Sequence, residues 1–114
     1  LSYPPHGHLI AVKFESKSNA RATQAARDYA SAARTFLRQN RKLGNSVFML
    51  GPAMAPLSKL KGRSRWQLLL KSKERQHVRQ TAIRMLEHVG HFDTSNRRHK
   101  NVRIIVDVDP INML

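Results

Sequence analysis

The fold is decided by the stretch Lys61-Gly62-Arg63-Ser64-Arg65-Trp66-Gln67-Leu68-Leu69-Leu70-Lys71. Between Gly62 and Lys71 the side chains alternate in character, with the period of two that is typical of a β-strand. One face of this strand is predicted to carry Ser64, Trp66, Leu68 and Leu70. The other face then carries Arg63, Arg65, Gln67, Leu69 and Lys71. We therefore expect a strand with one face in the core and one basic face.

The segment before this strand is predicted to form its hairpin partner. Residues 47–50 have the composition of a short strand, and Gly51-Pro52 followed by Pro56 should stop it. Because it is short and bounded by prolines, we expect it at the edge of the sheet.

Two further strands are predicted near the ends of the chain. Residues 8–16 alternate, with Ile10, Val12 and Phe14 on a well-buried face and Leu9, Ala11, Lys13 and Glu15 on a face that is only partly covered. Residues 102–108 are expected to bury Val102, Ile104, Val106 and Val108, and to end at Asp109-Pro110.

Two amphipathic helices lie between these strands. Ser18 or Asn19 can cap the first helix, whose buried face is predicted to comprise Ala22, Ala26, Tyr29, Ala33, Phe36 and Asn40. The second is predicted to start at the N-cap Ser72 and to end at Gly90, with a stripe of Val78, Ala82, Met85, Leu86 and Val89. Residues 91–100 are expected to form a polar, basic loop.

The resulting order is β-α-β-β-α-β, which defines the ferredoxin-like arrangement of the α+β class. In this fold a four-stranded, mostly antiparallel sheet carries both helices on one face, and right-handed crossovers place the first and third strands in the centre. The opposite sheet face has no helix of its own, and Arg63, Arg65 and Gln67 should project from it. Such a face favours an anionic ligand.

The composition limits the class of protein. A chain of 114 residues is the length of a single domain, and its 40% apolar and 25% charged residues are ordinary for a globular protein. The 21 Lys+Arg against 7 Asp+Glu give a net charge of +14, which points to a polyanion such as nucleic acid. Without cysteine, disulfides and thiolate sites are excluded. No apolar run is long enough to span a membrane. We expect a soluble intracellular domain of a larger chain, with residues 1–7 as a linker and 8–114 as the domain.

The cations fall into groups that predict a surface following a phosphate backbone. Thirteen of them are Arg, whose planar guanidinium can bind phosphate with two hydrogen bonds. The predicted DNA-binding residues are Arg34, Arg38, Arg41, Lys42, Lys59, Lys61, Arg65, Lys71, Lys73, Arg75, Arg79, Arg97, Arg98 and Lys100. A solvated surface without a ligand is the alternative interpretation of each group.

Several motifs together resemble a known family. They are Tyr3-Pro4-Pro5, Leu50-Gly51-Pro52-Ala53, Ala55-Pro56, the stretch of residues 61–71, and Val106-Asp107-Val108-Asp109-Pro110. In this order they resemble the C-terminal domain of the primosomal protein PriA, the bacterial replication-restart DNA helicase. The resemblance covers nearly the whole chain, and the ferredoxin-like topology of that domain agrees with the fold predicted from the residues.

The resemblance implies a binding module in a bacterial, cytoplasmic and nucleoid-associated protein. The family domain helps to hold single-stranded and branched fork DNA, works with other primosome proteins, and helps to dock the acidic tail of single-stranded-DNA-binding protein. Arg63 and Gln67 match the family's Arg-x-x-x-Gln pair that contacts this tail, whereas Ser64 replaces an aromatic residue that relatives often carry. The parent chain would be an ATP-dependent 3′-5′ helicase. Its ATP and zinc sites would lie elsewhere, since this sequence has no phosphate-binding loop and no Cys, and we expect no cofactor here.

Other functions stay open at this point. A ribosomal-protein-like RNA-binding domain shares the topology, although an RNA-recognition module would expose aromatic residues where this sequence has Lys13, Arg63 and Gln67. His6-x-His8 and His88-x-x-His91 lack a third metal ligand. A small phosphate-ester hydrolase would use Asp107 and Asp109, which we expect to pair with nearby Arg side chains instead.

Overall fold

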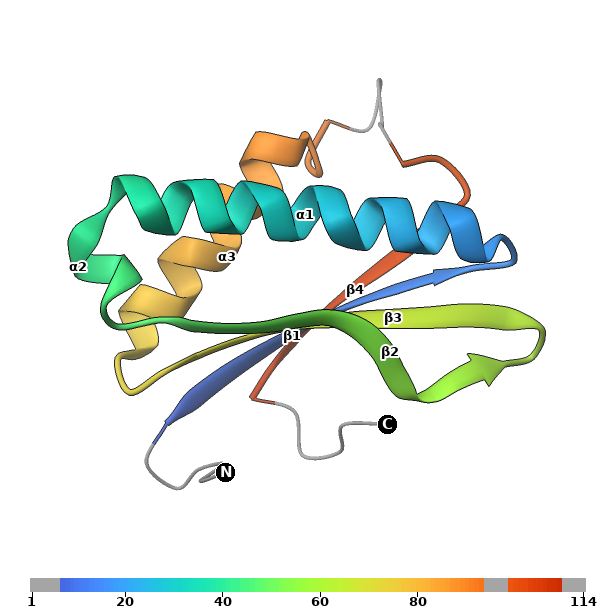
Figure 1. The fold of residues 1–114 in the computed structure, drawn as a ribbon, viewed down its shortest axis with the longest axis horizontal. Helices are drawn as coiled ribbons and strands as arrows, with labels where there is room; N and C mark the ends of the chain where they lie inside the picture. Colours follow the sequence, from blue (N-terminus) through green and yellow to red (C-terminus); the bar gives the residue numbers. More distant parts are fainter. Residues whose placement is uncertain (1–6, 94–98, 110–114) are drawn as a thin grey trace.

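The fold has the predicted order of strands and helices with one short addition (Figure 1). The computed structural model describes residues 7–93 and 99–109, without the side chains of residues 56–60. Its elements are β1 (His8–Ser16), α1 (Asn19–Gln39), α2 (Arg41–Gly44), β2 (Phe48–Leu60), β3 (Arg63–Ser72), α3 (Arg75–Val89) and β4 (Arg103–Val108). The four-residue α2 was not predicted.

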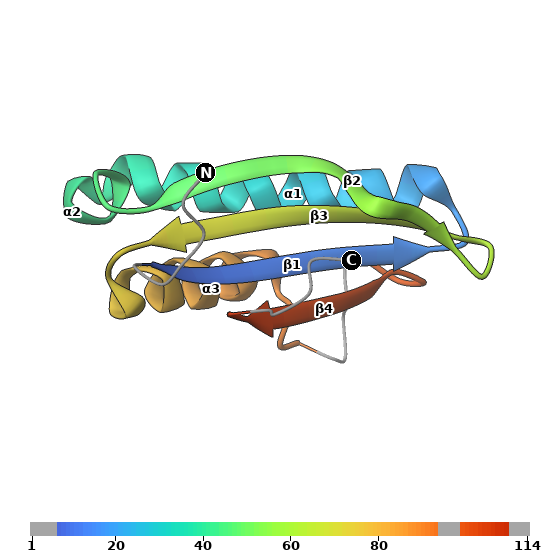
Figure 2. The ribbon, with the colours of Figure 1, turned by 90° about the horizontal axis from the view of Figure 1, so that it is seen from below.

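The strands form one antiparallel sheet in the order β2-β3-β1-β4. The first and third strands are central, as predicted. Helices α1 and α3 lie side by side on one face of this sheet, and in the second view the strands run in front of both helices (Figures 1 and 2). The structure therefore confirms the ferredoxin-like fold. Within residues 7–93 and 99–109, no helix covers the other face of the sheet, called here the helix-free face.

The core lies between the sheet and the two helices. Ile10, Val12 and Phe14 of β1 and Leu68 and Leu70 of β3 meet the alanine-rich side of α1 and the apolar stripe of α3. The ring of Phe14 packs edge-on against Tyr29, with 5.1 Å between the ring centroids. Small alanines let α1 pack closely against the sheet. Burial of apolar surface between the sheet and the helices is the main contribution that stabilises the fold.

Two of the three predicted helix-end signals are confirmed. Ser18 is the N-cap of α1 and accepts a hydrogen bond from the Arg21 N–H, while Gly90 ends α3 in the left-handed conformation with φ 81°. The stripe of α3 is buried as predicted. The N-cap assigned to Ser72 is wrong, because β3 extends through Ser72 and Glu74 is the N-cap of α3. The Ser72 hydroxyl instead accepts a hydrogen bond from the Glu74 N–H.

The edge strand β2 is much longer than predicted. It continues through Gly51-Pro52 to Leu60, 13 residues in all, although its position at the edge is confirmed. Pairing with β3 is interrupted between Leu50 and Ala53 and between Met54 and Lys59, where register shifts absorb the extra residues. Gly51 fits because its φ of 100° suits glycine and because a Cβ there would lie 2.9 Å from the Gln67 carbonyl oxygen. An irregular edge strand tolerates proline, whereas a central strand would lose a ladder hydrogen bond.

The helix-free face is more buried than the sequence predicts. Leu9 and Ala11 are buried, and so are the charged residues Lys13 and Glu15. The charges are tolerated because each is paired: Lys13 Nζ lies 3.0 Å from Asp107 Oδ2, and Arg65 Nε lies 2.8 Å from Glu15 Oε2. The prediction for Val108 is also wrong, since this last residue of β4 is 62% exposed.

Candidate anion-binding pocket and basic surface

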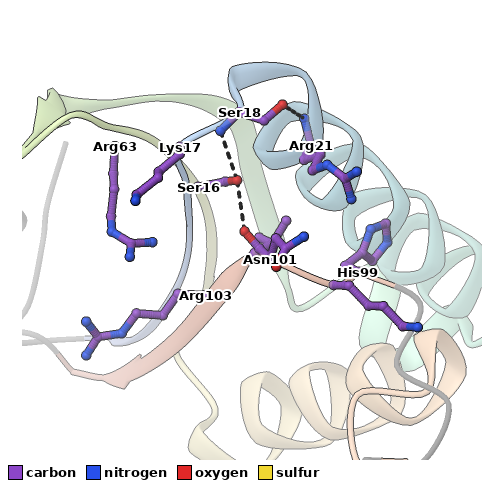
Figure 3. Close-up of a pocket in the computed structure, with 10 residues that line it drawn as sticks. Ser16, Lys17, Ser18, Arg21, Arg63, His99, Asn101 and Arg103 are labelled. Carbon is purple, nitrogen blue, oxygen red and sulfur yellow. Dashed lines mark hydrogen bonds between the residues drawn. The ribbon is translucent and has the colours of Figure 1, made fainter.

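A basic pocket lies where β1 ends and where β3 and β4 begin (Figure 3). It has a volume of about 720 Å³. Its charged lining comprises Lys17, Arg21, Arg63, Lys100 and Arg103, together with His99. No Asp or Glu contributes to the wall among the residues that the structure describes. Five cations from four segments therefore meet around one cavity without a neutralising carboxylate in its lining.

Hydrogen bonds between the polar residues at the back of the pocket fix its shape. The Ser16 hydroxyl donates to the Asn101 carbonyl oxygen at 2.9 Å and accepts from the Ser18 N–H at 3.1 Å. Ser18 in turn caps α1. Asn101 has a φ of 64°, a left-handed conformation that Asn tolerates better than most residues. These bonds hold the segment before β4 against the turn between β1 and α1.

The cations lie on two sides of the place where the segment before β4 meets the turn between β1 and α1. In Figure 3, Arg63, Lys17 and Arg103 lie on one side of Asn101, and Arg21 and His99 lie on the other. His99 Nε2 approaches Asp28 Oδ2 at 2.9 Å but lies outside hydrogen-bonding geometry, so the contact is an ion pair when the imidazole is protonated. The segment carrying Lys100 and Asn101 is thereby placed next to α1.

The predicted partner residues Arg63 and Gln67 share the helix-free face but not the pocket. Arg63 lines the pocket, whereas Gln67 lies four residues further along β3, about 13 Å away at the rise of a strand. Gln67 Oε1 is buried and accepts no hydrogen bond from the described residues. Arg65 lies between them and is held by Glu15. A single ligand can meet both residues only by running along β3.

The other predicted DNA-binding residues are distributed over several elements. Exposed positions are held by Arg34, Arg38, Arg41, Lys42, Lys61, Lys73, Arg75, Arg79 and Lys100. Lys71 is half-buried, and Arg65 is only 6% exposed and paired with Glu15. Arg97, Arg98 and the side chain of Lys59 lie outside the described residues. Of the members of this predicted set whose side chains the structure describes, only Lys100 lines the pocket.

Three exposed cations that belong to none of the predicted groups are prominent in the structure. Lys17 and Arg21 line the pocket, and Arg27 lies on α1. Each is isolated from the predicted groups along the chain. The capping signal at Ser18 could have suggested that Lys17 and Arg21 lie near the end of a strand, but their meeting with Arg63 depends on the sheet order.

The residues considered for catalysis are engaged in other contacts. Asp107 pairs with Lys13, and Asp109 accepts a hydrogen bond from the Leu9 N–H at 2.8 Å and lies 3.6 Å from His8 Nδ1. The expectation that Arg side chains would pair with these carboxylates is therefore wrong. Three or more His, Asp or Glu placed to hold a metal ion do not occur within the described residues, and His6 lies outside them. In the same part of the chain, no helix is long and apolar enough to cross a membrane.

Fold and site together define a small, strongly basic ferredoxin-like domain with a pocket lined by cations. The chain belongs to the family of primosomal protein N C-terminal domains, which matches residues 1–111. It is 29% identical to the replication restart protein PriA of Bacillus subtilis over 99% of its own length and 13% of that protein. Identity to the Treponema pallidum protein of the same name is 33%, over 100% of this chain and 15% of the relative. For Haemophilus influenzae PriA, identity is 35% over 82% of this chain and 12% of the relative.

The chain thus spans less than one sixth of the length of these relatives. Among solved structures, the de novo designed protein Foldit4 is similar with a TM-score of 0.52. The match covers 93% of this chain and 99% of the design at 11% sequence identity. This similarity concerns the fold alone. The family membership confirms the resemblance that the motifs indicated.

Proposed function

We propose that this chain is the DNA-binding C-terminal domain of a replication-restart helicase. It would hold single-stranded or forked DNA on its basic surface and help to dock the acidic tail of single-stranded-DNA-binding protein during primosome assembly. ATP hydrolysis and zinc binding would reside in other parts of the parent chain. The pocket formed by Lys17, Arg21, Arg63 and Arg103 is the observation that best supports an anionic partner.

The character of the pocket fits phosphate or carboxylate better than a neutral ligand. Guanidinium groups bind both kinds of oxyanion through paired hydrogen bonds. Several cations around one cavity repel one another until an anion neutralises them, so binding relieves an unfavourable interaction. Arg63 is one of the two residues, with Gln67, that the family resemblance assigns to the acidic tail, and its place in the pocket supports its role.

Binding of DNA is tested by fluorescence anisotropy of a labelled single strand and of a fork, titrated with the full 114-residue chain at several salt concentrations. If about four phosphates are contacted, log affinity for the single strand should fall with log salt at a slope of about −3. Competition by structured RNA decides between the two polyanions. A preference for RNA of more than about tenfold, which is about 1.4 kcal/mol, would favour the ribosomal-protein-like alternative.

Docking of the acidic tail is tested with the Arg63→Ala variant and an acidic peptide. Loss of a charge-assisted contact should weaken peptide binding by about 1–3 kcal/mol. Arg75→Ala is the matched control, because Arg75 is exposed at the start of α3 and does not line the pocket. Unchanged peptide affinity in Arg63→Ala would refute the assignment of the tail to this pocket.

A further inference from the structure

The outer side of α1 carries a line of arginines that faces away from the sheet. Residues Ala22, Ala25, Ala26, Tyr29 and Ala33 form its buried side. At 100° per residue, Arg27, Arg34 and Arg38 lie within about 40° of one another on the opposite side. All three are exposed, as are Arg41 and Lys42 in the following α2. We call Arg27, Arg34 and Arg38 the α1 ridge.

The charges of the α1 ridge are not balanced within the described part of the chain. No ion pair there involves Arg27, Arg34 or Arg38. Asp28, the one acidic residue of α1, faces His99 and accepts a hydrogen bond from Gln24. Arg34 and Arg38 are four residues apart, a spacing at which like charges destabilise a helix by a few tenths of a kcal/mol. An anion bound along the ridge would turn this repulsion into attraction.

The spacing of the ridge suits a phosphodiester backbone. Arg34 and Arg38 are separated by about 6 Å along the helix axis, and Arg27 and Arg34 by about 10 Å. A strand that lies along α1 can therefore contact all three guanidinium groups, each of which can bind a phosphate with two hydrogen bonds. Ser31, which is also exposed, lies between the arginines and leaves room for a close approach. A membrane or an apolar peptide would require large apolar side chains beside the charges, and the ridge has none.

The ridge is separate from the partner residues on β3. Arg27, the nearest residue of the ridge, lies six residues beyond the pocket residue Arg21, about 9 Å along the helix, and Arg38 lies about 26 Å along it. Helix α1 covers one face of the sheet, whereas Arg63 and Gln67 belong to the helix-free face (Figures 1 and 2). A nucleic acid on α1 and an acidic peptide along β3 would therefore occupy opposite sides of the domain.

We infer that the α1 ridge, continued by Arg41 and Lys42, binds the phosphate backbone of nucleic acid while the pocket and β3 remain free for an acidic peptide. This inference rests on the proposed function, because it assigns the two anionic partners to separate surfaces. Binding along the ridge should be independent of base sequence, because contacts to phosphates carry no sequence information.

The test compares two triple variants that remove the same charge. Arg27→Gln/Arg34→Gln/Arg38→Gln removes the ridge, and Lys73→Gln/Arg75→Gln/Arg79→Gln removes three exposed cations at the start of α3. Gln has a good helix propensity, so both should fold, and circular dichroism melts verify this. Using a labelled single strand, the ridge variant should bind at least ten times more weakly at low salt, and its salt slope should be shallower by about 2. The α3 variant removes the same charge from other predicted DNA-binding residues, so it should also bind more weakly, but its loss of affinity should be at least threefold smaller than that of the ridge variant.

Separation of the two surfaces is tested in the same assay with an acidic peptide. The ridge variant should bind this peptide within twofold of wild type, and saturating peptide should leave wild-type affinity for DNA within about threefold. Displacement of DNA by the peptide would overturn the separation, and equal losses in both triple variants would overturn the ridge. If the wild type binds DNA and the ridge variant binds it equally well, the assignment of DNA to the ridge is refuted, but the proposed function is not. Absence of DNA binding by the wild type refutes the proposed function and the ridge with it.

Discussion

The two faces of the sheet bury neighbouring residues of β1 by different means. Phe14 has no exposed surface and packs against Tyr29 on the helix-covered face. Glu15, the next residue, points to the helix-free face and is 8% exposed, with Arg65 Nε 2.8 Å from its carboxylate. Burying an aromatic ring requires only a complementary cavity, but burying a carboxylate requires a partner that offsets the lost hydration. On the helix-covered face, Phe14 is therefore stabilised by apolar packing. On the helix-free face, burial of Glu15 depends on its charge partner Arg65.

The largest expected effect is on the helix-covered face. Phe14→Ala should lower the free energy of unfolding by about 3–5 kcal/mol, because it removes apolar contacts and leaves a cavity next to Tyr29. Urea denaturation followed by circular dichroism measures this change. Phe14→Leu is the matched control. It should lose less than half as much stability as Phe14→Ala, because leucine fills most of the volume of the phenylalanine ring. A loss below about 1 kcal/mol for Phe14→Ala would contradict the central place of this ring.

Breaking the charge pair of Glu15 and Arg65 should lower the free energy of unfolding slightly less than Phe14→Ala does. Glu15→Gln keeps the shape of the side chain but leaves the Arg65 guanidinium buried without its carboxylate, so the free energy of unfolding should fall by about 3 kcal/mol. The same denaturation experiment measures it.

The double variant Glu15→Leu/Arg65→Met separates charge from shape on this face. Removing both charges together should recover most of the stability that Glu15→Gln loses, because no buried charge remains unpaired. If the double variant is as unstable as the single one, the helix-free face is held by something other than this pair.

The alternation of residues along the strands predicted which side chains share a face. Ile10, Val12 and Phe14 lie in the core, and Arg63 and Gln67 share the helix-free face, because parity along a strand is a local property. The capping signal at Ser18 was likewise readable from a few neighbouring residues. The fold class followed from the order of these local patterns.

The partners of the charged residues could not be predicted in the same way. Glu15 meets Arg65 because β1 and β3 pair in a register that aligns them, and that register is set by the whole sheet. The pocket joins Lys17 and Arg63, which are distant in sequence, for the same reason. The full length of β2 was missed because register shifts let a strand continue past Gly51-Pro52.

The smallest effect is expected at the second charge pair of the helix-free face. Lys13 Nζ lies 3.0 Å from Asp107 Oδ2, but the Asp107 side chain is 43% exposed. In Lys13→Met the remaining carboxylate can be hydrated, and the methionine fills much of the space of the lysine stem. The free energy of unfolding should therefore change by less than about 1 kcal/mol, the usual range for a pair that solvent screens. Urea denaturation beside Glu15→Gln gives the comparison directly. A loss as large as that of Glu15→Gln would mean that burial of Lys13, rather than exposure of Asp107, sets the strength of this pair.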